Sequence, residues 1–369
     1  MKSKSYNQIY FTKINVFLFT FFSLLFLTNC QKELDEITVN PFPKNDEQSI
    51  VIQGLADIEV AIISDWVTGT TSLQNSVSTF VKTPNTANLA TTRTQWKAAR
   101  NPWENNESFS FGPVGDDGID GASDDWPFDL TAFTQILSSN ITLNEAYITQ
   151  MATSTKGFHA IEYLLFGTNG NKAVNTFTTR ELKLLELLSN DLKKQSETLK
   201  SRWTKGSKNS FYDNFVKAGE ASSSYKKTSD ALGEVVGAMV NIMTELPDTK
   251  IERPLTKKDN NYAESRFADY SFNDYRSNIS GVYSVYVGKY GSVSATKSIS
   301  DLVLATNPKV DEKIRTQFKL CLALIDVLQT STTFNQAILT KPEQLKDLQK
   351  EIQKINQILD SEVKVVLGL

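Results

Sequence analysis

Residues 46–66 read DEQSIVIQGLADIEVAIISDW, and this stretch decides the class of fold. Apolar side chains return along it every three or four residues, at Ile50, Ile52, Leu55, Ile58, Ala61, Ile62 and Trp66. That spacing places them on one face of an α-helix, whereas a half-buried strand would alternate with a period of two. The stretch therefore predicts a long amphipathic helix with one buried side.

Similar patterns predict further helices over 85–100, 211–246, 313–328 and 342–367. A fifth begins at Thr178-Thr179-Arg180-Glu181, where a Thr followed three residues later by Glu is the signature of a capping box. Pro247 is expected to end the 211–246 helix. No segment alternates with period two between turn residues, so few strands are expected. The predicted class is all-α, built as helical bundles.

The length of 369 residues fits two domains at roughly 100–200 residues each. Gly206, Ser207 and Ser210 interrupt the helical pattern and suggest where the two meet. We therefore expect an N-terminal bundle over 47–205 and a C-terminal bundle over 206–369. Cys321 lies in an apolar helical face and is expected to be a buried core thiol.

The first 46 residues are expected to be a leader and a tether. Lys2, Lys4 and Lys13 precede an apolar run over 14–27, which is shorter than the ~20 residues of a spanning helix and typical of a secretory signal. Leu27-Thr28-Asn29-Cys30 resembles a lipobox. The expectation is a signal peptide over 1–29, lipidation of Cys30 and a flexible tether over 30–46. The alternative is an N-terminal anchor that is never cleaved.

Composition excludes several functions. A net charge of -3 provides no broad basic surface, so nucleic acid is not an expected partner. His159 is the only histidine, which excludes zinc sites with two or three imidazoles, the HExxH kind among them. A serine triad would have to use His159 as well, and no G-x-S-x-G elbow is present.

Residues 96–129 break the helical pattern. They hold three of the five Trp residues and six Asp between positions 116 and 129. Long aromatic loops in compact domains are usually functional, although a solvated acidic loop would look similar. A calcium loop is disfavoured because residues 116–120, DDGID, lack the spacing of an EF-hand.

A second interruption, residues 157–167, reads GFHAIEYLLFG. Residues three apart share a helix face, so His159 and Glu162 should project together. An imidazole and a carboxylate aimed at one point suit the metal sites of helical bundles. The structural alternative is a hydrogen-bonded core histidine.

Gly157-Phe158-His159-Ala160-Ile161-Glu162 resembles the G-x-H-x-x-E motif of the imelysin-like proteins. Segments 100–114, 125–127 and 264–288 resemble further signatures of that family, in the same order. The resemblance implies two helical-bundle domains with the motif near their interface. It also implies an envelope protein, often a lipoprotein, linked to iron uptake or iron regulation. One branch of the family was named as a metallopeptidase.

The side chains available as ligands restrict which metal ion such a protein could bind. With one imidazole available the other ligands must be carboxylates, and oxygen-rich sites suit ferric iron, manganese or calcium better than zinc. The favoured hypothesis is an outer-membrane lipoprotein, facing the periplasm or the exterior, that binds iron or an iron-carrying ligand. Its partners would be the membrane, through Cys30, and iron-transport components. The alternatives are a metallopeptidase in which Glu162 is catalytic, or a lipoprotein that binds a non-metal ligand.

Specific residues follow from this hypothesis. His159 and Glu162 are the first expected metal ligands, and the residues that could complete the site are Glu104, Glu107, Asp125 and Asp274. Five other residues are candidates for contacts to a ligand or to the carboxylates: Arg100, Ser271, Asn278, Trp103 and Trp126. Structural packing or capping is the alternative role for each of them.

Overall fold

The computed structural model describes residues 45–369, and helix α1 (Asn45–Lys82) opens it. The periodic apolar side of α1 is buried as predicted, with Ile52, Ile58 and Trp66 fully inaccessible. Ile50 departs from the pattern, because 43% of it is exposed. The predicted signal peptide, Cys30 and residues 30–44 of the predicted tether lie outside the described residues. The last two tether residues, 45 and 46, belong to α1.

The rest of the described chain is helix after helix, which confirms the all-α class. In its first part the helices are α2 (Thr86–Asn106), η1 (Glu107–Phe109), α3 (Pro113–Asp116), α4 (Ile119–Asp124), α5 (Leu130–Ser138), α6 (Glu145–Gln150), η2 (Thr153–Thr155), α7 (Gly157–Phe166), η3 (Val174–Thr176) and α8 (Thr179–Arg202). The remaining elements are α9 (Phe211–Val216), α10 (Thr228–Glu245), the π-helix η4 (Leu246–Ile251), α11 (Glu252–Lys257), η5 (Asn260–Tyr262), α12 (Ser271–Val287), β1 (Lys289–Tyr290), β2 (Val293–Ser294), α13 (Ile299–Thr306), α14 (Pro308–Ser331), α15 (Phe334–Thr340), α16 (Pro342–Ile358), the π-helix η6 (Leu359–Val363) and α17 (Lys364–Leu367). Within residues 45–369 the only strands are β1 and β2, which pair antiparallel.

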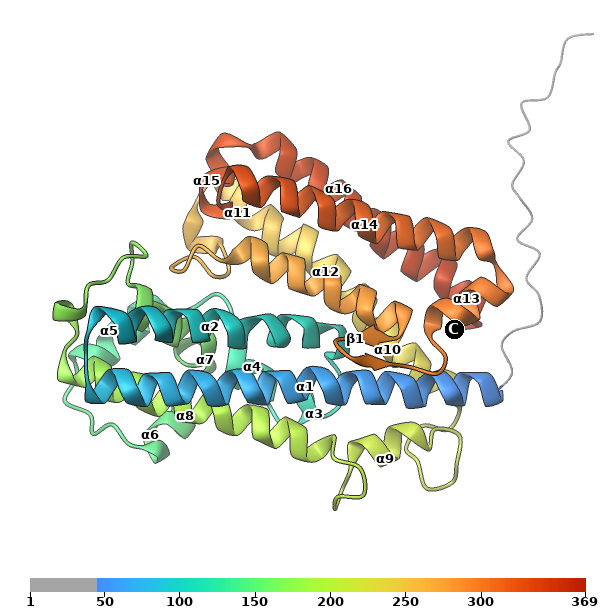
Figure 1. Ribbon diagram of the computed structural model, residues 1–369, viewed down its shortest axis with the longest axis horizontal. Coiled ribbons are helices and arrows are strands. Elements are labelled where there is room, and N and C mark those ends of the chain that lie inside the picture. Colours follow the sequence, from blue (N-terminus) through green and yellow to red (C-terminus); the bar gives the residue numbers. More distant parts are fainter. Residues whose placement is uncertain (1–44) are drawn as a thin grey trace, which may run out of the picture. The chain divides into compact units, whose positions relative to one another are not determined.

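Helices α1, α2 and α8 pack side by side, and α12, α14 and α16 form a second group with α10 (Figure 1). Helix α12 also packs along α2, so one continuous apolar core runs through both groups. The described residues belong to one compact unit. The division into domains over 47–205 and 206–369 stays a prediction.

Several local predictions from the sequence are confirmed. The capping box before α8 is present: the Thr178 hydroxyl accepts from the Glu181 N–H at 3.2 Å, and the Thr178 N–H donates to the Glu181 carboxylate at 2.8 Å. Cys321 is fully buried in α14, as predicted. The 342–367 helix is present too, although the π-helix η6 interrupts its α-helical pattern.

Other predicted boundaries are wrong. The 211–246 helix is two helices, because the Ser-rich segment 217–227 turns at Gly219 with φ +92°. The α-helical part, α10, ends at Glu245, but the helical path does not stop at Pro247. The chain continues as the π-helix η4, whose widened turn accommodates a residue without an N–H. Helix α2 likewise passes Pro102 and ends at Asn106, because burial of its last two turns outweighs the cost of the proline.

Gly281 marks the point of closest approach between α2 and α12. A Cβ at this position would lie 2.6 Å from the carbonyl oxygen of Asn105 and 2.8 Å from its Cα. Such distances leave no room for a side chain, so the contact between the helices requires glycine.

We expect Gly281→Ala to lower the free energy of unfolding by about 1–3 kcal/mol, because the added methyl pushes α12 away from α2. The matched control is Gly237→Ala in α10, where nothing lies within 4 Å of the added Cβ. That change should be neutral or stabilising by up to about 1 kcal/mol. Urea unfolding followed by circular dichroism measures both. Equal effects of the two substitutions would contradict the close-approach argument.

Candidate functional site

Gly157 begins helix α7 and brings it against the end of α4. Its φ is +72°, and a Cβ there would lie 2.2 Å from the carbonyl oxygen of Ser123. Only glycine allows this approach. As a consequence His159, in the first turn of α7, lies beside Asp124, the last residue of α4.

His159 and Glu162 lie together, as their spacing predicted. The Nδ1 atom of His159 is 3.3 Å from Glu162 Oε2, and its Nε2 atom is 3.2 Å from Asp124 Oδ1. Burial alone would favour the neutral ring. The hydrogen bonds to Asp124 and Glu162 outweigh it and raise the pKa of His159 to about 9. In the absence of a metal the imidazole is therefore protonated at neutral pH.

Glu162 uses its other oxygen to hold the backbone of a distant segment. Its Oε1 accepts hydrogen bonds from the N–H groups of Phe267 and Ala268, at 2.9 and 2.8 Å. These residues lie in the segment between η5 and α12. Both carboxylate oxygens of Glu162 are thus engaged, so the residue orients His159 and fixes that segment against α7.

Arg100 forms the centre of the site. Its guanidinium is inaccessible to solvent and lies over the ring of Phe158, 5.2 Å from the ring centroid. Four carboxylates surround it: Asp124, Glu104 at 2.5 Å, Glu264 at 3.0 Å and Asp274 at 3.3 Å. A planar guanidinium with five donors suits such multiple pairing.

Lys250 is a second buried cation, supplied by the π-helix η4. Its Nζ lies 2.8 Å from Glu264 Oε1, 3.5 Å from Glu107 Oε1 and 3.9 Å from Glu104 Oε2. We call the nine connected residues the charged cluster: Arg100, Glu104, Glu107, Asp124, His159, Glu162, Lys250, Glu264 and Asp274.

The charged cluster contains six carboxyl groups against three basic groups, and burial is the largest influence on the pKa values of Glu104, Glu107, Asp124 and Asp274. Burial raises the pKa of Glu107 to about 8, although Lys250 opposes the shift. Burial likewise raises the pKa of Asp274 to about 7 against the effect of Arg100, and it raises the pKa of Glu104 well above its usual range. For Asp124 burial is outweighed, and Arg100 with His159 holds its pKa below the usual range.

Three oxygen-bearing members of the cluster could hold a metal ion together. Glu104, Glu107 and Asp124 each offer an oxygen, and these oxygens all lie within 4.8 Å of one another. Among the described residues, Glu264 Oε2 and Asn278 Oδ1 are buried and accept no hydrogen bond. Carboxylate oxygens such as those of Glu104, Glu107 and Asp124 are ligands that hard cations prefer. The donor set therefore fits an ion such as iron or manganese.

Several predicted residues lie in or against the charged cluster. The indole N–H of Trp103 donates to Asp124 Oδ2 at 2.6 Å, and the side-chain amide of Asn278 donates to Glu104 Oε2 at 2.8 Å. Arg100, Glu104, Glu107 and Asp274 are members of the cluster itself. Ser271 is buried one turn before Asp274, in the first turn of α12.

Two residues predicted for the site, Asp125 and Trp126, are not members of the charged cluster. The sequence analysis chose Asp125, but Asp124 is the residue that joins the cluster, because it is the last residue of α4 and faces His159. The carboxylate of Asp125 instead accepts a hydrogen bond from the hydroxyl of Thr153. The guanidinium of Arg253 lies over the ring of Trp126, with Cζ of Arg253 5.7 Å from the ring centroid.

Three members of the charged cluster were not predicted from the sequence: Asp124, Glu264 and Lys250. Asp124 is adjacent to the residue that was chosen, and no pattern in the loop indicates which of the two points inward. Glu264 lies in a segment that carries the family resemblance, so a signal existed although no role was assigned. Lys250 has no sequence signal, since a buried lysine on a π-helix depends on tertiary structure.

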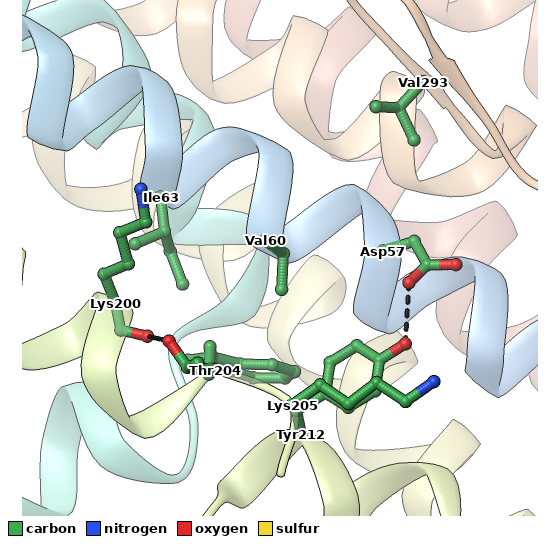
Figure 2. Close-up of a pocket in the computed structure, with 9 residues that line it drawn as sticks. Asp57, Val60, Ile63, Lys200, Thr204, Lys205, Tyr212 and Val293 are labelled. Carbon is green, nitrogen blue, oxygen red and sulfur yellow. Dashed lines mark hydrogen bonds between the residues drawn. The ribbon is translucent and has the colours of Figure 1, made fainter. Parts of the chain in front are cut away.

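The charged cluster is enclosed, whereas an open pocket lies elsewhere. His159 is 1% exposed, and Glu162 and Glu104 are fully buried. The pocket, of ≈ 570 Å³, lies among α1, the end of α8, α9 and β2, and Figure 2 shows the Tyr212 hydroxyl pointing to Asp57 at its edge. None of the residues that line the pocket belongs to the cluster.

Comparison with known proteins identifies the family. The family model described as imelysin, Peptidase_M75, matches residues 60–361, most of the chain. This chain belongs to the imelysin family. A curated relative, iron-regulated protein A of Synechococcus elongatus, is 32% identical over 269 residues, which is 72% of this chain and 72% of the relative.

Two solved structures share the imelysin fold. One, from Parabacteroides distasonis, is described as an iron-regulated protein A precursor. It is 23% identical, covers 88% of this chain and 96% of its own, and has a TM-score of 0.80. The other is an imelysin-like protein of Psychrobacter arcticum, which is 13% identical with a TM-score of 0.74 over 90% of this chain and 98% of its own. No helix within residues 45–369 of this imelysin-family chain has the length and apolar character needed to cross a membrane.

We expect Arg100→Met to lower the free energy of unfolding by about 3–5 kcal/mol, because it leaves buried carboxylates without their counter-ion. The matched control is Arg276→Met, which removes an exposed pair with Asp326 and should cost less than about 1 kcal/mol. Urea unfolding at pH 7 measures both. A cost for Arg100→Met no larger than that of the control would show that the cluster does not depend on this cation.

We also expect stability without metal to fall as pH rises from about 6 to 9. The folded pKa values of His159, Glu107 and Asp274 lie above their ordinary values, so the folded chain holds more protons than the unfolded chain in this window. For His159 the contribution is complete below its ordinary pKa of 6.5 and is lost as pH rises through about 9.

Urea unfolding across this pH range measures the effect. His159→Gln should flatten the profile between pH 6.5 and 9, removing up to roughly 3 kcal/mol of pH-dependent stability. Glu343→Gln, at an exposed carboxylate, should leave the profile as it is. A His159→Gln profile as steep as that of the wild type would contradict the assignment.

Proposed function

We propose that this imelysin-family protein binds a metal ion, with iron as the first candidate, or a ligand that carries one, and that it serves iron uptake in the bacterial envelope. The observation that carries the proposal is the group formed by Glu104, Glu107 and Asp124, whose oxygens lie within 4.8 Å of one another. Three carboxylates gathered inside a protein suit a hard cation, which would offset their mutual repulsion.

Each neighbour of this group has a distinct role in the proposal. Glu104, Glu107 and Asp124 supply oxygens to the ion. His159 lies against Asp124, and Glu162 orients its ring through Nδ1. Because burial raises the pKa of Glu107 to about 8, this ligand has to lose its proton when the metal binds, so binding would release protons and strengthen with rising pH. Arg100 stays in place as the counter-ion of the remaining carboxylates.

Iron is favoured by two separate arguments. Oxygen donors with at most one imidazole suit iron or manganese better than zinc. The curated relative, at 32% identity, is named an iron-regulated protein, which supports a link to iron without identifying the ion. The lipid anchor on Cys30, the outer-membrane location and the iron-transport partners remain part of the proposal.

The peptidase alternative gains no support from the geometry. A metallopeptidase needs an open coordination position for water and a groove for an extended chain. His159 and Glu162 are 1% and 0% exposed, and both oxygens of Glu162 are already engaged. A general base in this position could not reach a peptide without rearrangement of the surrounding segments.

We expect the purified protein to bind about one Fe²⁺ per chain under anaerobic conditions. Asp124→Asn and Glu107→Gln should weaken binding by at least about ten-fold, and so should His159→Ala and Glu162→Ala, which disturb the support of Asp124. Isothermal titration and elemental analysis measure affinity and stoichiometry.

Asp125→Asn is the matched control for these substitutions. It changes the neighbouring carboxylate, which is bonded to Thr153, and should leave the affinity unchanged. A loss of binding in this variant alone would favour the residue that the sequence analysis chose. No Fe²⁺ or Mn²⁺ bound by the wild type would reject the metal site and leave a lipoprotein that binds a non-metal ligand.

A further inference from the structure

Lys250 occupies an unusual position for a lysine. It lies on the π-helix η4, and its residue is 3% exposed. Its carbonyl oxygen accepts a hydrogen bond from the Tyr275 hydroxyl at 2.9 Å, which fixes the backbone. π-helical turns are rare and occur frequently at functional sites, where the extra residue re-aims a side chain. Here the turn aims an ammonium group into the charged cluster.

The ammonium group contacts the same carboxylates that could hold the metal ion. Its Nζ lies 3.5 Å from Glu107 and 3.9 Å from Glu104, two of the three members of that group. A cation held by those oxygens would lie within a few ångströms of Nζ. Two positive charges that close in a buried site repel strongly. The ammonium group and the metal ion therefore compete for the same carboxylates.

The two cations of the cluster differ in how easily they can leave. Arg100 is tied to four carboxylates through a rigid planar group. Lys250 is a point charge on a flexible four-carbon stem, and its one short contact is to Glu264 at 2.8 Å. Of the pair, only Lys250 can withdraw its charge by rotating its side chain.

Lys250 contacts the most exposed of the candidate ligands. Glu107 is the most exposed of the three candidate ligands, with 16% of its side chain exposed against 3% for Asp124 and 0% for Glu104. The carboxylate of Glu245, an exposed residue, acts on Lys250 electrostatically. The ammonium nitrogen lies closer to Glu107, at 3.5 Å, than to Glu104, at 3.9 Å.

We propose that Lys250 is an internal counter-ion that takes the place of the metal at the Glu104–Glu107 side of the cluster and is displaced when the metal binds. This inference rests on the proposed metal site. It assigns Lys250 the role of setting the affinity: the ammonium group stabilises the empty site and lowers the affinity for cations. A site with this counter-ion favours ions that bind strongly enough to displace it.

The test is Mn²⁺ binding to the full chain, measured by electron paramagnetic resonance titration. Lys250→Met removes the charge and keeps the length of the side chain, so Mn²⁺ should bind at least about ten-fold more tightly than to the wild type. Lys250→Arg keeps the charge and should bind no more tightly than the wild type. The matched control is Lys172→Met, which removes a similarly short pair to Glu181 at 2.7 Å outside the cluster and should leave Mn²⁺ affinity unchanged.

The outcomes separate the two proposals. Mn²⁺ binding by the wild type with no increase in Lys250→Met would overturn the counter-ion role and leave the metal site standing. No binding by either protein would overturn both. Binding by Lys250→Met alone would reject metal binding by the wild type, and with it the displacement of Lys250 by a metal.

A second measurement uses only the wild type, in case Lys250→Met does not fold. Acetic anhydride labels accessible amines, and mass spectrometry reports the label at each lysine. Labelling of Lys250 should be low without metal and rise several-fold at saturating Mn²⁺, while labelling of Lys172 stays constant. Unchanged labelling of Lys250 in the Mn²⁺-saturated protein would show that the ammonium group is not displaced, and would overturn the inference.

Discussion

The guanidinium of Arg100 is the interaction on which the rest of the site depends. It lies on α2 and pairs with Asp124 at the end of α4, Glu264 before α12 and Asp274 within α12. A buried arginine is stable only where carboxylates compensate it, and buried carboxylates need such a cation in turn. The packing of α2 against α12, permitted by Gly281, brings these charges together. The charged cluster therefore joins elements that the core brings together.

The charged cluster contains six carboxyl groups and only three basic groups, an excess of acid that suits a site for a cation. Burial raises the pKa values of Glu104, Glu107 and Asp274 above their usual ranges, against the opposing effect of Arg100 and Lys250. Glu107 is the most exposed carboxylate of the three that could hold a metal ion, with 16% of its side chain exposed.

The sequence predicted the fold more completely than the site. The period of the apolar residues was enough for α1, and the Thr178 capping box was enough for the start of α8, because both signals are local. Pro247 gave the wrong end for the predicted 211–246 helix, since the chain continues as the π-helix η4. At the site, spacing on one helix predicted the meeting of His159 and Glu162. It could not distinguish Asp124 from Asp125, nor find Lys250, because those positions depend on how separate elements pack.

The G-x-H-x-x-E motif acquires a physical meaning from these contacts. Gly157 lets α7 approach α4, His159 then meets Asp124, and Glu162 binds the two N–H groups of the segment before α12. Each motif residue therefore joins α7 to another part of the cluster, and none of the three needs to touch a ligand to be indispensable. The motif assembles the site, while the oxygens that can receive a cation come from α2, η1 and α4. A substitution in the motif would displace Asp124 or residues 264–268, so a loss of function there would not by itself identify a catalytic or ligating residue.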